Sequence, residues 1–272
     1  MSEDWQGRTG DSWAAEWRRT DRGFAALTEE LLRRSREFRF GHALDIGCGA
    51  GELSLALARG RPHVRVTGVD ISPQLLAVAR ERSANLANAS FVEGDAARWQ
   101  PPTDATPDLI VSRHGVMFFA DPEAAFAHFA HTAVPGCGLL FSCFRAREEN
   151  PVFSDIARLL PGAEPPGDPD APGPFAFADA ARVERILIGA GWREIAFAPF
   201  DFAMITGVGP DPIEDTVEYF NRIGPAARAM AELPFEERER FAERVRGVAA
   251  RNIFDGTVSL RAAAWLVTAR KP

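Results

Sequence analysis

A glycine-rich segment flanked by acids holds the residues whose types and spacing are best suited to chemistry. Asp45 ends an apolar run and is followed at once by three glycines at alternate positions, Gly47, Gly49 and Gly51. Glycines permit a tight turn and let a ligand approach the backbone, and the helix after such a turn offers N–H groups to an anion. Asp70 ends the next apolar run, where an acid can accept hydrogen bonds from ribose hydroxyls. The spacing therefore predicts a nucleoside-binding site.

The acid before the glycines separates two classes of nucleoside. A dinucleotide-binding loop has a third glycine where this chain has Glu52, and Asp45 would repel a pyrophosphate. The same carboxylate would attract an ammonium group. S-adenosylmethionine carries an ammonium, a carboxylate, a ribose diol and an adenine amine, and the segment offers a partner for each. We interpret the loop as a site for this amino-acid-bearing nucleoside, with an NAD(P)-dependent reductase as the alternative.

Short apolar runs that alternate with helical patterns must position these acids. Seven runs have the texture of strands, at 43–48, 64–70, 90–95, 108–114, 138–144, 193–205 and 257–270. Helical patterns lie near 51–59, 73–83, 121–133 and 178–190, with one or two further helices within 11–37. Strands separated by helices imply a parallel sheet covered on both faces, whose ligands bind beyond the carboxyl ends of the strands.

Four segments carry a resemblance to a known family. "LDIGCGAG", "VTGVDIS", "EGDA" and "DLIVSRHGVMFFADP" resemble the successive motifs of class I S-adenosylmethionine-dependent methyltransferases, within the ubiquinone/menaquinone-biosynthesis-like group. The likeness covers about residues 40–145, and the tail "AAAWLVTARKP" resembles the last strand of that group. It implies an α/β fold, a three-layer doubly wound sheet of seven strands that is mostly parallel with the last strand antiparallel.

The resemblance also implies S-adenosylmethionine as the cofactor and assigns residues to it. These are Asp45, Gly47 and Gly49 at the methionyl part, Asp70 and Ile71 at the ribose and adenine, Asp95 and Ala96 at the adenine amine, and Ser112 and Arg113 at the methionyl end of the fourth strand.

His114 is the one histidine that we predict at the carboxyl end of a strand. A pKa near neutrality would let it take a proton from a phenol or a carbon acid, whereas a carboxylate acceptor needs no base. Two interpretations stay open: His114 is the catalytic base, or it lines the pocket or bonds the backbone. His128 and His131 lie three apart on a predicted helix, but no carboxylate or cysteine joins them, so no metal site is predicted.

Candidate acceptor-binding residues come from three distant segments: Trp17, Arg145 and Tyr219. Arg145 follows the fifth strand, where a guanidinium can hold an anionic acceptor; a solvated loop is the alternative. Tyr219 lies in an amphipathic stretch between the last two strands and is expected to help line an acceptor pocket. Trp17 is expected to close over the site or to pack in the core.

The chain divides into a core and two helical additions. Residues 1–40 are expected to form an N-terminal helical cap, 41–210 with 253–272 the Rossmann-like core, and 211–252 an insertion of two helices. We interpret the cap and the insertion as a lid over the acceptor; additional packing is the alternative. A Pro/Gly/Asp-rich stretch at 161–174 is expected to be an exposed loop.

The composition of the chain limits the kinds of partner and compartment that we expect. The net charge of −7 argues against a nucleic-acid partner, because phosphate binding needs a concentrated basic surface. The three cysteines show no disulfide or metal-ligand spacing, which is typical of a reducing cytoplasm. No apolar run is long enough to span a membrane, and the first residues lack the apolar core of a signal peptide. We therefore predict a cytoplasmic protein, and the sequence does not indicate its oligomeric state.

These observations predict an enzyme that transfers a methyl group from S-adenosylmethionine to O, N or C of a small molecule. A natural product or a carboxylate is included among the acceptors, because a lid favours a small acceptor over a flat macromolecular surface. The alternative is a non-catalytic S-adenosylmethionine-binding protein or partner subunit, since binding residues alone do not establish turnover.

Overall fold

The computed structural model of the chain describes residues 5–162 and 167–272. Within these ranges eight strands form one sheet. They are β1 (His42–Ile46), β2 (Arg65–Asp70), β3 (Ala89–Glu93), β4 (Leu109–Arg113), β5 (Gly138–Phe144), β6 (Arg193–Gly207), β7 (Ile253–Phe254) and β8 (Thr257–Arg270). All seven predicted strands are present, and the two-residue β7 is additional.

The sheet is doubly wound, as predicted. Its strand order is β3-β2-β1-β4-β5-β8-β6, and β7 pairs with β8. The first five strands are parallel, while β8 runs antiparallel between β5 and β6. The order reverses between β1 and β4, so a crevice opens beyond the carboxyl ends of these two strands, where ligands of such sheets bind.

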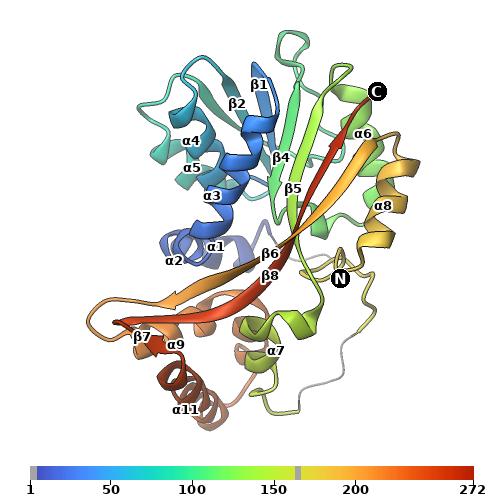
Figure 1. Cartoon of the computed structure of the whole chain (residues 1–272). Helices are drawn as coiled ribbons and strands as arrows, with labels where there is room; N and C mark the ends of the chain where they lie inside the picture. The colour runs from blue at the N-terminus through green and yellow to red at the C-terminus, as the bar shows by residue number, and fades with distance from the viewer. Residues whose placement is uncertain (1–4, 163–166) are drawn as a thin grey trace.

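Helices cover both faces of the sheet and extend below it (Figure 1). The α-helices are α1 (Arg8–Ala15), α2 (Trp17–Gly23), α3 (Ala25–Arg34), α4 (Glu52–Gly60), α5 (Pro73–Arg82), α6 (Pro122–Thr132), α7 (Pro151–Ala157), α8 (Ala180–Gly189), α9 (Pro212–Arg222), α10 (Gly224–Met230) and α11 (Phe235–Arg251). Short 3-10 turns are η1 (Ser35–Glu37), η2 (Thr103–Ala105), η3 (Val116–Phe118) and η4 (Arg147–Glu149).

Local sequence explains why several helices start where they do. Asp121 and Asp211 each precede a proline and cap a helix: their side chains accept from the backbone N–H of Ala124 and Glu214. Proline fits the first turn because its missing N–H would have no partner there. Ser72 caps α5 in the same way, two residues after Asp70. These caps fix the loops at the carboxyl ends of the strands.

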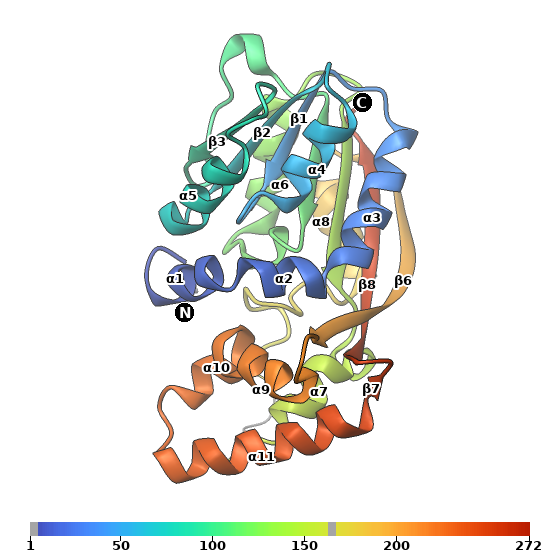
Figure 2. The ribbon, with the colours of Figure 1, turned by 90° about the vertical axis from the view of Figure 1, so that its left-hand side faces the viewer.

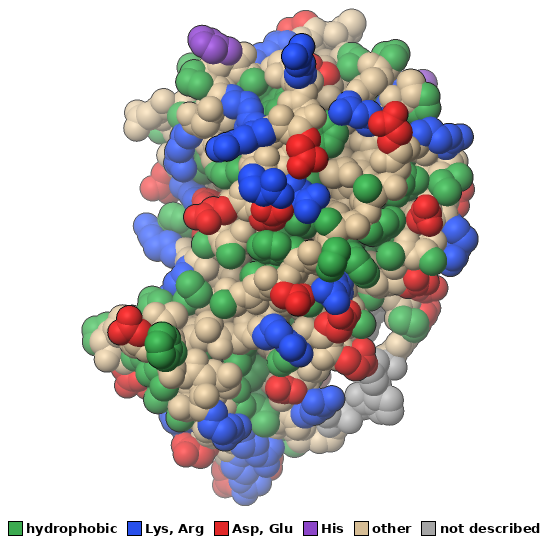
Figure 3. Space-filling view, viewed as in Figure 1, with side chains coloured by type: hydrophobic (Ala, Val, Ile, Leu, Met, Phe, Trp, Pro, Cys, Tyr) green, Lys and Arg blue, Asp and Glu red, His purple; other side chains and the backbone are tan. Residues whose placement is uncertain are grey.

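The last two long strands connect two parts of the molecule. β6 and β8 pair over nearly their full length and run beyond the parallel strands. Figure 2 shows α7, α9, α10 and α11 grouped below the sheet, with α1 and α2 lying across the space between. The pair of long strands thus carries the inserted helices to the crevice. On the face in Figure 3, basic and acidic side chains are interspersed.

The helical additions differ in detail from the sequence expectation. The N-terminal part holds three α-helices rather than one or two, because the backbone leaves helical geometry at Glu16 and Phe24. The insertion holds three rather than two, since α9 ends at Arg222 and Gly224 begins α10 with a positive φ. The predicted loop at 161–174 has no helix or strand where it is described, and residues 163–166 lie outside the described residues.

A continuous core joins the sheet to these helices. The fully buried Trp192 packs there and donates from Nε1 to the carbonyl of Phe126, at 3.0 Å. In the described part of the chain, every helix is too short or too polar to cross a bilayer.

Candidate active site

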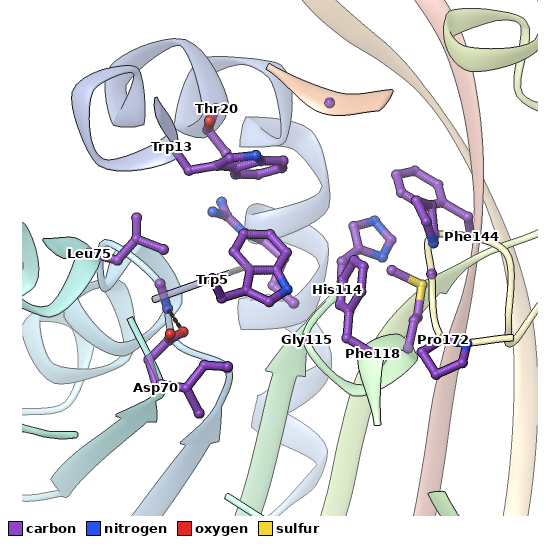
Figure 4. A pocket seen from close by; sticks show the side chains of 18 of the residues that line it. Trp5, Trp13, Thr20, Asp70, Leu75, His114, Gly115, Phe118, Phe144 and Pro172 are labelled. Atoms are coloured by element: carbon purple, nitrogen blue, oxygen red, sulfur yellow. Dashed lines mark hydrogen bonds between the residues drawn. The ribbon is translucent and has the colours of Figure 1, made fainter. Parts of the chain in front are cut away.

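One large cavity opens beyond the carboxyl ends of the parallel strands. Its volume is about 970 Å³, at the upper limit of the ~300–1,000 Å³ usual for small-molecule sites. One part, the nucleoside end, is lined by Asp45, Gly47, Gly49, Asp70 and Asp95. The other part, the aromatic end, is lined by Phe24, His114, Phe144, Arg147, Phe153, Phe175 and Tyr219. Figure 4 shows Asp70 and Leu75 on one side of the pocket and His114, Phe144 and Pro172 on the other.

The glycine loop adopts backbone conformations that would be strained in residues other than glycine. Gly47, Gly49 and Gly51 have φ of +62°, +54° and +85°, in the left-handed region. A Cβ at Gly51 would lie 2.9 Å from the Phe91 ring, whereas one at Gly49 would meet no protein atom within 4 Å. The loop is held from β2, because Val69 accepts from the N–H of Gly47. Its open side at Gly49 therefore offers bare backbone to a ligand in the cavity.

Asp70 is fixed by backbone amides. Its two oxygens accept from the N–H groups of Gly49, at 2.8 Å, and Ser72, at 2.9 Å. Burial raises the pKa of this carboxyl, and the hydrogen bonds from Ser72 and Gly49 oppose the rise. A carboxylate accepts about four hydrogen bonds, so Asp70 retains acceptor capacity for a diol in the cavity.

Asp45 is the most buried acid of the nucleoside end, with a side chain 1% exposed. Burial raises its pKa to about 7, opposed by the Ser54 hydroxyl, which donates at 2.6 Å, and by the positive charge of Arg113. A carboxyl with this pKa can neutralise an ammonium group that enters the cavity.

The remaining predicted cofactor residues separate into lining and supporting positions. Ile71, Asp95, Ala96 and Arg113 line the cavity, and Asp95 accepts from the N–H of Ala97 at 3.0 Å. Ser112 is not among the lining residues. Its hydroxyl donates to the carbonyl of Ile46 at 2.7 Å and accepts from the N–H of Gly115 at 3.1 Å. Ser112 thus ties the loop after β4 to β1.

A charged network that the sequence did not indicate lies at the cavity wall. Asp21 on α2 pairs with Arg113 at 3.1 Å and with Arg82 at 2.9 Å. The Arg82 guanidinium also stacks over the Trp17 ring, 3.9 Å from its centroid. Trp17 lines the cavity, as does Trp5, whose ring meets Trp13 edge-on. No motif joins these positions, because the contacts depend on how α1 and α2 cross the sheet.

His114 lies at the aromatic end in an unusual conformation. Its φ is +61°, and its backbone N–H donates to Ser142 at 3.2 Å. The ring stacks on Phe144, with centroids 4.0 Å apart, and meets Phe24 edge-on at 5.3 Å. Burial, reinforced by the charge of Arg113, lowers its pKa to about 3. This makes His114 a weak proton acceptor.

Two of the predicted acceptor residues have different surroundings. Arg145 does not line the cavity: it pairs with Asp201 at 2.8 Å and with Glu149. Arg147, two residues later, does line it, with its guanidinium 4.6 Å from the centroid of Phe175. Tyr219 lines the cavity from α9, and burial raises the pKa of its hydroxyl.

Ion pairs join the N-terminal helices to the insertion. Asp215 on α9 accepts from Arg19 at 2.8 Å and pairs with Arg22 at 2.9 Å. Its second oxygen also accepts from the N–H of Val208 at 3.0 Å. We call Arg19, Arg22 and Asp215 the roof clasp, because they connect α2 to α9, and both of these helices line the cavity.

Comparisons of the sequence with known proteins find methyltransferases. Residues 43–136 match the methyltransferase domain family. The chain is 31% identical over 160 residues to trans-aconitate 2-methyltransferase of Paracidovorax citrulli, covering 59% of this chain and 57% of the relative. It is 32% identical over 129 residues to malonyl-[acyl-carrier protein] O-methyltransferase of a Paenibacillus species, covering 45% and 46%. The chain spans about half the length of the curated relatives that it matches.

Solved structures share the fold over more of the chain. Phosphoethanolamine N-methyltransferase 2 of Haemonchus contortus, in complex with S-adenosyl-L-methionine, covers the whole chain with 60% of its own length. Its TM-score is 0.60 at 18% identity. The YcgJ protein of Bacillus subtilis covers 90% of the chain with 98% of its own, at a TM-score of 0.54 and 19% identity. At these identities the likeness confirms the Rossmann-like fold.

Proposed function

Because the chain contains a class I S-adenosylmethionine-dependent methyltransferase domain, we propose that it methylates a carboxylate oxygen of a small molecule, with S-adenosylmethionine as donor. One observation carries the proposal: a single cavity joins the nucleoside end to the aromatic end. A donor and an acceptor held at the two ends would share one enclosed space, which provides the proximity that displacement reactions need.

The nucleoside end fits the donor group by group. Asp70, held by two backbone amides, would accept from the ribose hydroxyls. Asp45 would neutralise the ammonium group, and the bare backbone at Gly49 would lie against the methionyl part. Asp95, whose side chain is 52% exposed, stands at the cavity edge where it would accept from the adenine amine.

The chain itself has three tasks in the reaction. When bound, S-adenosylmethionine supplies a methyl group on a sulfonium; a carboxylate oxygen forms the new O–C bond as the C–S electron pair returns to sulfur. The aromatic end orients the acceptor and excludes water, and the nucleoside end fixes the donor. No proton has to leave a carboxylate acceptor.

That last point favours a carboxylate over a phenol or a carbon acid. Within the aromatic end, the side chains that could take up a proton are His114 and Tyr219. The pKa of His114 falls to about 3, and Tyr219 keeps its proton because burial raises its pKa. Burial raises the pKa of Asp21, but the charges of Arg113 and Arg82, which pair with its carboxylate, oppose that rise. The relatives named for trans-aconitate and malonyl-[acyl-carrier protein] also support a carboxylate acceptor.

The cap at 1–40 and the insertion at 211–252 would then form the lid of this site. Trp5 and Trp17 line the cavity from the cap, and Tyr219 lines it from the insertion. The roof clasp ties the two together.

Calorimetric titration with S-adenosylmethionine, S-adenosylhomocysteine and NADH tests the donor. We expect micromolar binding of the first two and none of NADH. Binding of NADH alone would establish a dinucleotide protein instead. S-adenosylhomocysteine release with a panel of carboxylic acids then tests turnover, and release with none of them would leave a non-catalytic binder.

A further inference from the structure

His114 is a buried polar side chain whose chemistry the fold does not use. Its residue is 9% exposed, and neither ring nitrogen has a hydrogen-bond partner among the described residues. Buried polar atoms in native proteins are almost always paired, so an orphaned pair of nitrogens in a cavity wall calls for a ligand. His114 lines the cavity, beside Phe144 in Figure 4.

The backbone and the neighbouring rings hold this imidazole in one place. A positive φ at a residue other than glycine is a strained conformation that persists where the surroundings enforce it, often at functional sites. Stacking on Phe144, with 17° between the planes, and the edge of Phe24 fix the ring plane. The nitrogens are therefore presented at a set position rather than on a mobile side chain.

The rings around His114 also form a continuous apolar wall. Phe144 meets Phe153 edge-on at 4.9 Å and lies 6.0 Å from Phe175. Phe153 and Phe175 are themselves 5.8 Å apart, nearly perpendicular. Such a wall favours a flat apolar body, which buries surface against it and stacks on its rings.

The charges near this wall do not suit a polyanion. Among the described residues, four arginines line the cavity. Arg113 is paired with Asp21, Arg98 is paired with Asp95, and Arg228 is engaged as well. Arg147 lies over the Phe175 ring. A tricarboxylate would have to leave charge against phenylalanine, where an unpaired ion is costly.

We propose that His114 donates a hydrogen bond to the acceptor carboxylate, and that the acceptor is a monocarboxylic acid whose aromatic body packs on Phe144, Phe153 and Phe175. This inference rests on the proposed methyl transfer and names its acceptor class and a further binding residue. A neutral imidazole has one N–H donor and one acceptor nitrogen, so it can orient a carboxylate without taking a proton. The new ester and S-adenosylhomocysteine balance the charges of carboxylate and sulfonium.

The charged groups around the ring keep His114 neutral. Arg113 is the neighbouring charge, and its sign disfavours the imidazolium; Phe24 and Phe144, which cover the ring, carry no charge. Its pKa of about 3 leaves the ring neutral throughout the physiological range.

Two substitutions separate the hydrogen bond from the shape of the ring. His114→Phe keeps an aromatic ring against Phe144 but removes the N–H, and His114→Gln keeps an N–H donor. With 3-phenylpropanoate as acceptor, we expect His114→Phe to raise KM about 10- to 100-fold, as for a lost hydrogen bond to a charged group, and His114→Gln to recover part of that loss. His131→Gln, at an exposed position, is the control and should change nothing.

Binding and pH profiles distinguish this role from others. Calorimetry with 3-phenylpropanoate in saturating S-adenosylhomocysteine should show the same loss of affinity, while S-adenosylmethionine affinity and the melting temperature of His114→Phe stay close to those of the unaltered protein. At saturating S-adenosylmethionine, the rate of the unaltered protein should not rise between about pH 6 and pH 8, because no proton has to be removed from a carboxylate acceptor. A rise in that interval that disappears in His114→Phe would make His114 a base. An unchanged acceptor KM in His114→Phe would mean that His114 lines the cavity without binding the acceptor.

The acceptor class has its own decisive comparison. We expect 3-phenylpropanoate to have a kcat/KM at least about tenfold above that of trans-aconitate. Burial of its phenyl ring against the apolar wall stabilises its complex, whereas burial of additional carboxylates without partners costs free energy. Preference for trans-aconitate, or no turnover of aryl monocarboxylates by protein that binds S-adenosylmethionine, would overturn the inference and leave the donor site intact. Failure to bind S-adenosylmethionine would instead overturn the proposed function.

Discussion

The two ends of the cavity are built in opposite ways. The nucleoside end uses consecutive strand ends and their loops, all within residues 45–96, and backbone conformation does much of the positioning. The aromatic end gathers side chains from the junction of α2 and α3, the residue after β4, strand β5, the turn η4, α7 and the segment after it, and α9. A site made by backbone turns leaves a continuous trace in the sequence. A site made by side chains from distant segments depends on the packing of the whole fold.

The largest effect should come from Asp70, the acid on which the nucleoside end depends. Asp70→Ala releases the N–H of Gly49 and removes the carboxylate that we propose accepts from the two ribose hydroxyls. Charge-assisted hydrogen bonds contribute about 1.5–3 kcal/mol each, so S-adenosylmethionine affinity should fall about 100-fold or more by calorimetry.

Asp104→Ala is the matched control, because that acid is 84% exposed and is not among the residues that line the cavity. It should leave the affinity unchanged. An affinity of Asp70→Ala within about threefold of the original would remove the ribose assignment.

Asp45 should make donor binding depend on pH. Its pKa of about 7 lies above the ordinary 3.8, so the folded protein binds more protons than the unfolded chain between these values. The free energy of unfolding should therefore fall as pH rises from about 4 to about 7, and then level.

The ammonium of the donor favours the ionised carboxylate, so binding below pH 7 must release the Asp45 proton. Affinity for S-adenosylmethionine should rise by up to about tenfold per pH unit between about pH 5.5 and pH 7. Asp45→Asn should abolish both pH dependences: that of the free energy of unfolding, measured by denaturant titration, and that of S-adenosylmethionine affinity, measured by calorimetry. A slope that persists in Asp45→Asn belongs to another group.

The roof clasp tests whether the acceptor side depends on its cover. Asp215→Ala leaves the partly buried Arg19 and Arg22 without their shared carboxylate. A loss of about 1–2 kcal/mol should lower the melting temperature by about 2–4 °C per kcal/mol. Acceptor KM should rise several-fold, with a smaller change in donor affinity.

Glu243→Gln provides the comparison for the clasp, since Glu243 forms an exposed pair with Arg246 on α11. Exposed pairs contribute little, so neither the melting temperature nor KM should move. Equal effects of Asp215→Ala on donor and acceptor would mean that the clasp stabilises the fold without gating one end.

The contrast between the ends also explains what sequence could predict. Asp70, Gly47 and Gly49 line the cavity, and the sequence could indicate them because strand, turn and cap are all local. The alternation of strands and helices predicted the parallel sheet. Arg145 was predicted at the acceptor site, whereas Arg147 lines the cavity, because a sequence shows only that both residues follow β5. The short turn η4 decides which guanidinium reaches the cavity. Asp21 left no signal at all, since its partners Arg82 and Arg113 are distant in the chain.

Substitutions at Arg145 and Arg147 should have the smallest effects, and they test most specifically which side chains contact the acceptor. Arg147→Ala uncovers the Phe175 ring and removes a charge at the cavity, so acceptor KM should rise about 3- to 10-fold with S-adenosylmethionine affinity unchanged. Arg145→Ala breaks pairs with Asp201 and Glu149 outside the lining, so it should lower the melting temperature slightly and leave KM within about twofold. The reverse result, with KM sensitive at Arg145 and not at Arg147, would mean that the acceptor approaches from the β6 side, where Asp201 lies. The aromatic end would then be a packed core, and the side-chain half of the site would have to be sought along β6.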